Sequence, residues 1–355
     1  MGQGRQGPGL PGVIVAGRVL VAMSGGVDSS MAAASVLEQG YIVSGVTLLL
    51  EPGNTASSEH AARVSAILGI PHTTLDMTQL FNERVVSPFR RSYLSGLTPN
   101  PCVVCNHFIK FGALMDYASA GGFDYLATGH YARILELRGI YKLIRGMDRS
   151  KDQSYFLYML DQARLGKILF PLGGQNKKVV KAKAASLGIM RAVQANESQD
   201  VCFVPHGGIA AMLATEVGPV PGDIVDLSGR ILGKHKGIAG YTIGQRRRLG
   251  VSSGEPLYVT GIDAKSDRLL VGPRSCLQRS SLTAADVSWV SGAAPNEDTD
   301  ITAKIRHKSG EFAVKVIILH NKLRIAFDQP QFGVAPGQSV VLYHGDEVLG
   351  GAVIE

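Results

Sequence analysis

Residues 22–30 form a short glycine-rich string, AMSGGVDSS, between an apolar run and a helical pattern. The two glycines let the backbone approach an anion closely, Ser24 adds a hydroxyl, and the N–H groups that open the following helix attract negative charge. The string therefore predicts a phosphate-binding loop. Asp28 is suited to a Mg²⁺ ion that bridges phosphate oxygens, because magnesium is usually held by one or two carboxylates and the substrate's phosphates.

Two observations limit what this loop does. It lacks the Gly-Lys-Ser/Thr ending of a Walker loop, so transfer of a terminal phosphate is the less favoured reaction. The structural alternative is a tight strand-to-helix turn in which Ser29 caps the helix. Because the whole string is more specific than a glycine pair, we favour phosphate binding.

The chain contains four cysteines, too few in 355 residues for a secreted disulfide framework, so a special cysteine here is expected to be catalytic or metal-binding. Cys102 and Cys105 have the Cys-x-x-Cys spacing of a metal-ligand pair. A structural zinc site needs four ligands, and the sequence has no second such pair, which argues against zinc. Cys276 has no partner in sequence and is expected to be an inert buried thiol.

Length and composition set the frame for these residues. A chain of 355 residues exceeds what one hydrophobic core usually organises, which predicts two or three domains, and 45% hydrophobic with 18% charged residues fits a folded globular protein. The apolar residues 13–23 are interrupted by Arg18 and lead into the glycine loop, so they predict a buried strand and not a signal peptide. No stretch approaches the roughly 20 apolar residues of a membrane-spanning helix, and a cytoplasmic protein is expected.

The net charge of +7 is concentrated in one segment. Residues 141–191 contain eleven Lys and Arg against three Asp, so this segment alone carries +8. One interpretation is a solvated helix face, as in most charge runs. The other is a phosphate-binding surface, since Lys and Arg supply most of the sequence-independent affinity for nucleic acids. The segment alone does not decide between them.

Strand and helix patterns alternate in the first part of the chain. Strands are predicted at residues 18–23, 41–50, 72–76 and 123–128, and helices at residues 29–39 and 58–68. This alternation is typical of an α/β fold with a doubly wound parallel sheet, whose ligand lies at the carboxyl ends of the strands.

The composition changes after residue 204, where Gly and Pro separate short β-prone segments and predict a small central domain. From residue 280 onward apolar and polar residues alternate, and His344-Gly-Asp is a plausible hairpin turn, which together predict a C-terminal β-barrel. We expect domains at residues 1–205, 206–279 and 280–355.

Residues 24–29 resemble the pyrophosphate loop of the ATP pyrophosphatase (PP-loop) superfamily, whose members adenylate a carbonyl or carboxylate oxygen. Further motifs in the same order resemble the bacterial tRNA-specific 2-thiouridylase family along nearly the whole chain. These motifs lie at residues 98–106, 109–112, 127–131, 151–156, 197–203, 244–246 and 336–338.

The resemblance implies ATP-dependent 2-thiolation of the wobble uridine (U34) of tRNA. The C2 carbonyl oxygen would be adenylated, and a persulfide on Cys202, delivered by a donor protein, would attack C2 with release of AMP. Cys105 would then cleave the S–S bond and form a disulfide with Cys202, so the two thiols must meet. The chemistry calls for a low-pKa thiolate, which Lys110 or a helix N-terminus could provide. Asp28 would complete the catalytic set through Mg²⁺.

The family pattern also implies binding residues. ATP would contact the loop and two further positions, namely Ala22, Met23, Ser24, Gly25, Gly26, Val27, Asp28, Ser29, Leu48 near adenine, and Gly129. The flipped-out target base would lie against Asn100, Pro101 and Cys102. The tRNA would contact the central domain and His130, Lys151, Asp152, Gln153, Arg306, His307 and Gln338, and the basic segment then reads as tRNA surface.

Alternatives remain at this point. Many family members carry Asp at the position of Cys102, and three thiolates from Cys102, Cys105 and Cys202 could instead hold a [4Fe–4S] cluster with one open iron. A different PP-loop tRNA sulfurtransferase, or a synthetase acting on a metabolite, would share the ATP loop. A non-catalytic RNA-binding protein would explain the basic segment and leave the loop without a role.

Overall fold

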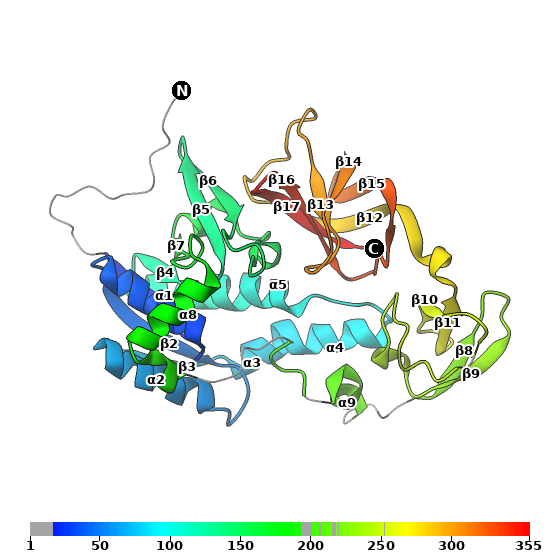
Figure 1. Ribbon diagram of the computed structural model, residues 1–355, viewed down its shortest axis with the longest axis horizontal. Helices are drawn as coiled ribbons and strands as arrows, with labels where there is room; N and C mark the ends of the chain where they lie inside the picture. The colour runs from blue at the N-terminus through cyan, green and yellow to red at the C-terminus, as the bar shows by residue number, and fades with distance from the viewer. Residues whose placement is uncertain (1–16, 194–200, 206, 215–217, 219, 252) are drawn as a thin grey trace.

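The computed structural model describes residues 17–193, 201–205, 207–214, 218, 220–251 and 253–355. Residues 197–200 of the motif that precedes Cys202 lie outside these ranges, as do residues 1–16. Three sheets organise the described chain, with five, four and eight strands (Figure 1).

The first sheet is parallel, with the strand order β3-β2-β1-β4-β7. Its strands are β1 (Arg18–Ala22), β2 (Ile42–Leu49), β3 (His72–Asp76), β4 (Tyr125–Ala127) and β7 (Ile168–Leu169). In β1, Val19 and Val21 pack on one face with helices α1 (Val27–Glu38), α2 (Ala56–Leu68) and α8 (Lys177–Ser186), while Leu20 packs on the other. Both faces are therefore buried, as a parallel sheet requires.

Helices between β3 and β4 cover the second face of this sheet. They are α3 (Thr78–Phe81), the π-helical η1 (Asn82–Val86), α4 (Ser87–Leu94), α5 (Pro101–Cys105), the π-helical η2 (Asn106–Ala113) and α6 (Leu114–Ala120). Ala22 and Leu48, near the carboxyl ends of β1 and β2, pack against the same buried cluster as Cys105. The thiol-bearing helix thus lies over the edge of the sheet where ligands bind in this fold.

The central region contains a four-stranded sheet in the order β10-β11-β8-β9. Its strands are β8 (Gly222–Val225), β9 (Ile231–His235), β10 (Tyr258–Asp263) and β11 (Arg268–Gly272), preceded by α9 (Gly208–Ala214). It has a small core of its own, centred on Ile224, Val259 and Leu269. Cys276 lies just beyond it, in η6 (Arg274–Leu277), and is only half-buried, so the expectation of a buried thiol was wrong.

Six antiparallel strands form a closed barrel, because the first strand pairs with the last. They are β12 (Gln278–Trp289), β13 (Thr302–Lys304), β14 (Phe312–Leu319), β15 (Lys322–Phe332), β16 (Ser339–His344) and β17 (Glu347–Ile354). The two-residue turn between His344 and Glu347 is the predicted hairpin. The α/β class, the parallel sheet and the C-terminal barrel predicted from the sequence are confirmed.

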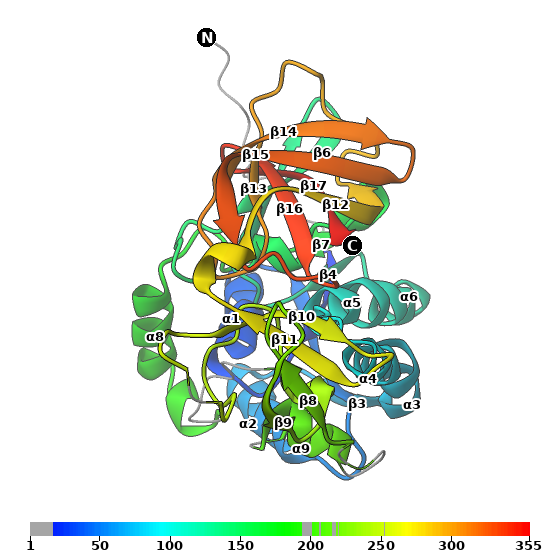
Figure 2. The ribbon, with the colours of Figure 1, turned by 90° about the vertical axis from the view of Figure 1, so that its right-hand side faces the viewer.

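A hairpin from the first half of the chain joins this barrel. Strands β5 (Ala132–Leu137) and β6 (Ile140–Arg145) follow β4, and β6 pairs with β17. Figure 2 shows the barrel stacked above the parallel-sheet region. The remaining short helices are η3 (Ser154–Phe156), α7 (Gln162–Leu165), η4 (Ile189–Arg191) and η5 (Ile238–Gly240). No helix among the described residues is both long and apolar enough to cross a membrane.

Candidate active site

The glycine loop at the end of β1 presents free backbone donors. Gly25 has a φ of 74°, a left-handed conformation that favours glycine. Helix α1 begins after Gly26 without a side-chain cap from any described residue. Ser30 Oγ instead donates to the Gly26 carbonyl at 2.9 Å, and the Ser24 N–H donates to Ser29 Oγ at 3.0 Å. The first N–H groups of α1 are therefore available to an anion, as predicted for a phosphate loop.

Gly129, predicted to contact ATP, lies against this loop. A Cβ atom at this position would be 2.8 Å from the Asp28 carbonyl carbon and 2.8 Å from the Ser29 nitrogen. Such contacts are closer than van der Waals packing allows, so only glycine fits here. The end of β4 is thereby held directly beside the first turn of α1.

Asp28 has two partners that the sequence reasoning missed. Lys177 Nζ lies 2.6 Å from each oxygen of the Asp28 carboxylate, and Tyr131 Oη donates to Oδ1 at 2.9 Å. Lys177 is buried, although it belongs to the basic segment that was interpreted as surface. The Asp28 carboxylate thus accepts from a buried ammonium group and from a phenol hydroxyl, and the lone pairs that these bonds leave open are the ones that would hold a Mg²⁺ ion.

Three cysteines gather at the N-terminus of α5. Cys102 and Cys105 lie one turn apart on this helix, which Pro101 opens. Cys105 is buried, whereas Cys102 and Cys202 are exposed, and all three thiols are free. Each pair is close enough for the charge on one thiolate to raise the pKa of another. The structure thus brings the two predicted sulfur-transfer residues together.

The surroundings of the three thiols favour their neutral form. Burial raises the pKa of Cys105 to about 11. Neighbouring atoms also displace water around the sulfur atoms of Cys102 and Cys202, whose side chains keep exposed area, and this desolvation raises their pKa values as well. The ammonium group of Lys110 opposes this effect at all three thiols, while Glu51 adds to it at Cys202. The expectation of a low-pKa thiolate was therefore wrong, because desolvation outweighs the nearby cation.

Lys110 and Phe111 connect the thiols to the phosphate loop. Burial lowers the pKa of His130, and the charge of Lys110 lowers it further. The centroids of the His130 and Phe111 rings are 5.8 Å apart. His130 Nδ1 is hydrogen-bonded to Thr128 Oγ1 at 2.7 Å. Since His130 follows Gly129 directly, the contact between these two buried rings links η2 to the start of α1. His130, predicted to contact tRNA, is enclosed here.

Phe203 anchors the segment that carries Cys202. Its ring packs edge to face on Phe81 and Phe89, with centroids 5.5 and 5.1 Å away. Phe203 and Glu51 also line a cavity of about 390 Å³ beside the thiols. Cys202 is therefore held at a site that opens to solvent.

The segment that leads to Cys102 is docked on the barrel. Gln338 Nε2 donates to the Thr98 carbonyl at 2.9 Å, and the Thr98 N–H donates to the Pro336 carbonyl at 2.8 Å. Asn100, predicted to line the target base, is hydrogen-bonded through its side chain to Tyr155. Gln338, predicted to contact tRNA, positions this segment, and its contact with tRNA stays a prediction.

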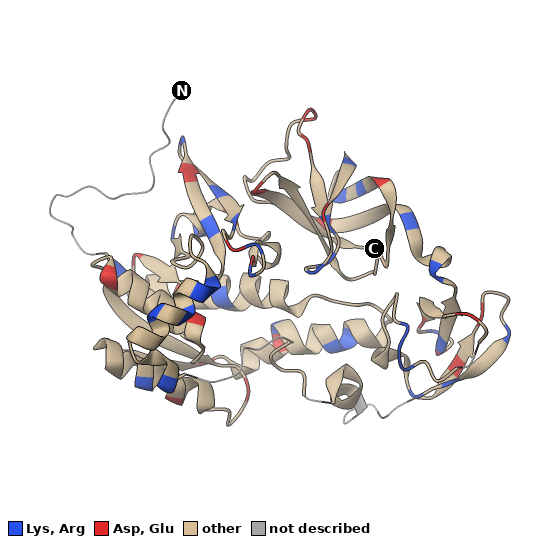
Figure 3. Ribbon diagram, viewed as in Figure 1, with Lys and Arg blue, Asp and Glu red and all other residues tan. Residues whose placement is uncertain are grey.

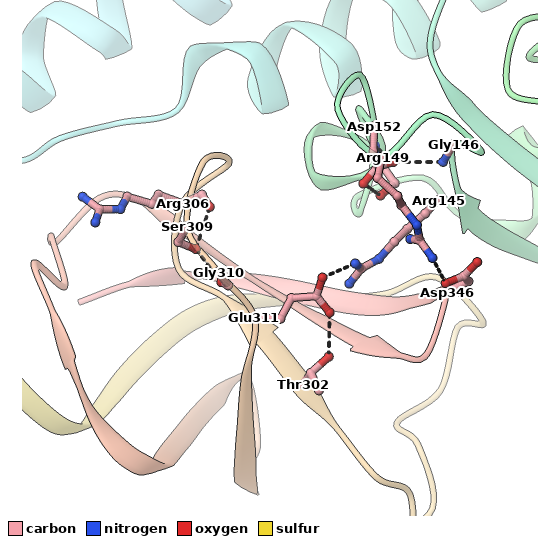
Figure 4. Close-up of polar contacts among 11 residues, drawn as sticks. Arg145, Gly146, Arg149, Asp152, Thr302, Arg306, Ser309, Gly310, Glu311 and Asp346 are labelled. Atoms are coloured by element: carbon pink, nitrogen blue, oxygen red, sulfur yellow. Dashed lines mark hydrogen bonds and ion pairs between the residues drawn. The ribbon is translucent and has the colours of Figure 1, made fainter. Parts of the chain in front are cut away.

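The loop after β6 also reaches the barrel. Figure 4 shows Arg145 paired with Glu311 and Arg149 paired with Asp346. Asp152 is buried, and its Oδ1 accepts hydrogen bonds from the N–H groups of Gly146 and Ser154 at 3.0 and 3.1 Å.

Other predicted tRNA residues lie around this loop. His307 Nε2 lies 3.1 Å from the Asp152 carbonyl oxygen, and Gln153 Oε1 accepts from the Tyr131 N–H at 2.9 Å. Arg306 is exposed and Lys151 is half-exposed. Asp152, Gln153 and His307 thus make internal contacts, while Arg306 and Lys151 reach the surface.

Much of the charge of the basic segment is neutralised within the fold. At least six of its Lys and Arg form ion pairs, namely Lys142, Arg145, Arg149, Arg164, Lys177 and Lys183. Arg164 pairs with Asp161 inside the segment, and the other five pair with acids outside it. Figure 3 shows basic residues also on the central region and the barrel. A uniform tRNA surface along residues 141–191 is therefore a poor description.

The alternative of an iron–sulfur cluster has no assembled ligand set. Within the described residues, no three His, Cys, Asp or Glu side chains are arranged to hold a metal ion. Cys102, Cys105 and Cys202 are neighbours, but their sulfur atoms do not point to one common position, as three ligands of one cluster must.

The glycine loop lies at the carboxyl edge of a parallel sheet, is followed by an uncapped helix start, and has three thiols beside it. This arrangement defines an α/β enzyme of the PP-loop class. The chain matches the models of a tRNA methyl transferase HUP domain at residues 17–206, a tRNA methyl transferase PRC-barrel domain at 210–273 and an aminomethyltransferase β-barrel domain at 279–354. It is 45% identical to the tRNA-specific 2-thiouridylase MnmA of Gloeothece citriformis, over 95% of this chain and 99% of the relative.

The MnmA protein of Chloroflexus aurantiacus is also 45% identical, over 95% of this chain and 98% of the relative. The chain therefore belongs to the tRNA-specific 2-thiouridylase family, which confirms the resemblance seen in the motifs. Among solved structures, the U34-tRNA thiolase NcsA from Methanococcus maripaludis has a TM-score of 0.36 at 17% identity, covering 53% of this chain and 62% of that chain. That similarity is too low to support an argument about this site.

Proposed function

We propose that this enzyme activates the C2 carbonyl of the wobble uridine of tRNA with ATP and replaces its oxygen with sulfur. The observation that carries the proposal is the grouping of Cys105 and Cys202 around Lys110. This group lies next to the buried contact between Phe111 and His130, which borders the phosphate loop. ATP phosphates would bind the N–H groups of residues 24–29, with Leu48 bordering adenine. Lys177, held by Asp28, places a cation beside that loop.

The sulfur step balances without an external oxidant. The terminal sulfur of a Cys202 persulfide attacks C2 of the adenylated base, and AMP leaves with the former carbonyl oxygen. The Cys105 thiolate then attacks the Sγ atom of Cys202. The electron pair of the broken S–S bond stays on the sulfur bound to C2, which gives 2-thiouridine, and a Cys105–Cys202 disulfide remains. The Cα atoms must approach to about 4.4–6.8 Å for this bond.

Exposure suits the different roles of the two thiols. Cys202 is exposed beside the cavity that Glu51 lines, so a persulfide-carrying donor protein can reach it. Cys105 is buried, so it meets only a sulfur that is already in the site.

Asn100, Pro101 and Cys102 are proposed to line the target base. Arg306 and Lys151 are proposed to contact tRNA, and the enzyme is proposed to act in the cytoplasm.

The proposal is tested with Cys105→Ser and Cys202→Ser, using Cys276→Ser as the matched control. Each protein is purified without iron and incubated with ATP, unmodified tRNA and a persulfide donor, and the tRNA is then digested and analysed by mass spectrometry. We expect 2-thiouridine with the wild type and the control, and none with the other two variants, which still bind ATP. Full activity of either variant contradicts the persulfide route. Activity only after reconstitution with iron and sulfide favours the cluster route.

A further inference from the structure

Cys102 has a thiol that the proposed sulfur transfer does not use. Its side chain is exposed, and its pKa responds to the charges of Lys110 and Cys202, so it lies in the same group as the reacting thiols. The charge of Cys102 in turn raises the pKa of Cys105. A third thiol within reach of a disulfide can exchange with it.

The covalent frame fixes Cys102 one helical turn from Cys105. Side chains three residues apart on a helix have Cβ atoms about 5–6 Å apart, while a disulfide needs about 3.5–4.5 Å, so closing the bond requires a movement of roughly 1–2 Å. Cys102 is in the first turn of α5, directly after Pro101, where Asn100 already has a non-helical backbone. An end turn is the part of a helix that adjusts most easily.

Cys102 and Cys105 also share the layout of dithiol redox sites. A Cys-x-x-Cys motif at a helix N-terminus, with one thiol exposed and the other buried, is the arrangement used by disulfide oxidoreductases. Here Cys102 is the exposed member and Cys105 the buried one. An external reductant therefore has access to Cys102 and no direct access to the sulfur of Cys105.

We propose that Cys102 is the resolving thiol that releases Cys202 after each sulfur transfer, an inference that rests on the proposed function. The Cys102 thiolate attacks the Sγ atom of Cys105 in the Cys105–Cys202 disulfide. The bond to Cys202 breaks, and Cys202 leaves as a thiolate that takes up a proton. The product is a Cys102–Cys105 disulfide, with no net change in oxidation state.

The cycle closes with a dithiol reductant. One thiolate of that reductant attacks the exposed sulfur of Cys102, its second thiol resolves the mixed disulfide, and the helix regains both thiols. The tethered Cys102 competes well against direct reduction of Cys202, because a group held one helical turn away has an effective concentration of millimolar order or above. Cys202 can then accept the next sulfur while Cys102 and Cys105 are still joined as a disulfide on α5.

The test is a disulfide map after one turnover without reductant. Wild-type enzyme loaded with persulfide is mixed with ATP and tRNA, quenched with N-ethylmaleimide, and digested for mass spectrometry. We expect one Cys102–Cys105 disulfide per 2-thiouridine formed, with Cys202 alkylated. Cys102→Ser is expected to lose that disulfide and to carry Cys105–Cys202 for each product it makes.

A kinetic arm uses the ratio of the steady-state rate at limiting dithiol to the single-turnover rate. This ratio should fall several-fold in Cys102→Ser and stay unchanged in Cys276→Ser. Product formation in the wild type with a Cys105–Cys202 disulfide and alkylated Cys102 overturns the inference and leaves the proposed function intact. Absence of both 2-thiouridine and any disulfide overturns the proposed function, and the inference with it.

Discussion

Among the residues that the structure describes, Lys110 is the cation that acts on all three thiols of the site, so its replacement tests the electrostatics directly. Lys110 and Cys105 are five residues apart on one continuous helical segment, which corresponds to ~7.5 Å along the axis. With an effective dielectric constant of about 20, an ammonium and a thiolate at that separation attract by ~2.2 kcal/mol. Lys110→Met should therefore reduce the thiolate fraction of Cys105 by ~40-fold at fixed pH.

The rate falls by less than the thiolate fraction. A thiolate with a higher pKa is intrinsically more nucleophilic, and a Brønsted coefficient of about 0.4–0.5 recovers roughly fivefold. We expect Cys105 in Lys110→Met to react ~8-fold more slowly. The assay measures carbamidomethylation of Cys105 by iodoacetamide between about pH 7 and 10, with mass spectrometry of the peptide. Lys110→Arg keeps the charge and should behave as the wild type, and Lys178→Met removes an exposed lysine elsewhere.

The pH dependence of the wild-type reaction rate is the second part of this test. Because burial raises the pKa of Cys105 to about 11, its reaction rate should rise about tenfold per pH unit across that range without a plateau. A plateau below about pH 9 would show that Cys105 is not desolvated as the structure indicates. Equal rates in Lys110→Met and Lys110→Arg would refute the role of the lysine.

Three further predictions concern binding and stability. Gly129→Ala should weaken ATP binding at least ~10-fold in calorimetry, because its Cβ would meet the first turn of α1, whereas Gly174→Ala, in open space, should not. Glu311→Gln leaves the buried Arg145 guanidinium without its partly exposed carboxylate partner and should lower the free energy of unfolding by ~1–3 kcal/mol in urea titrations. The third prediction follows from the raised pKa of Cys105: the neutral thiol contributes its full stability below about pH 9, and above that pH the unfolded chain is stabilised by losing the Cys105 proton first. That stability, about 3 kcal/mol, should be lost between about pH 9 and 11 relative to Cys105→Ala.

Local patterns were enough to predict the sheet and the loop. The glycine string needs a strand before it and a helix after it, and both are short-range features that β1 and α1 reproduce. The thiol pair was predicted through family motifs, because nothing in the spacing of Cys105 and Cys202 indicates that they meet. The hairpin of β5 and β6 was missed although the two strands pair locally. Its attachment to the barrel could not be read from local patterns, since it depends on β17, about two hundred residues away.

Electrostatic properties were predicted less well because they depend on burial. Lys177 was counted with its charged neighbours, yet the fold turns it inward to Asp28. Lys110 was recognised as a cation near the thiols, but the sequence does not show how far desolvation raises the pKa of Cys105. The sign of a pKa shift follows from the balance of these two effects, and only the packed structure supplies it.

The segment of residues 98–105 joins the barrel to the sulfur chemistry. Its first residue, Thr98, exchanges hydrogen bonds with Pro336 and Gln338 of the barrel, and its last is Cys105. Asn100 lies between them and is bonded to Tyr155, whose hydroxyl also donates to the Ser339 carbonyl. A shift of the barrel on binding tRNA would therefore be passed to the start of α5 through a few hydrogen bonds. The thiols that must come within bonding distance lie at the end of that connection, so residues 98–105 are the route by which a movement of the barrel would reach the sulfur site.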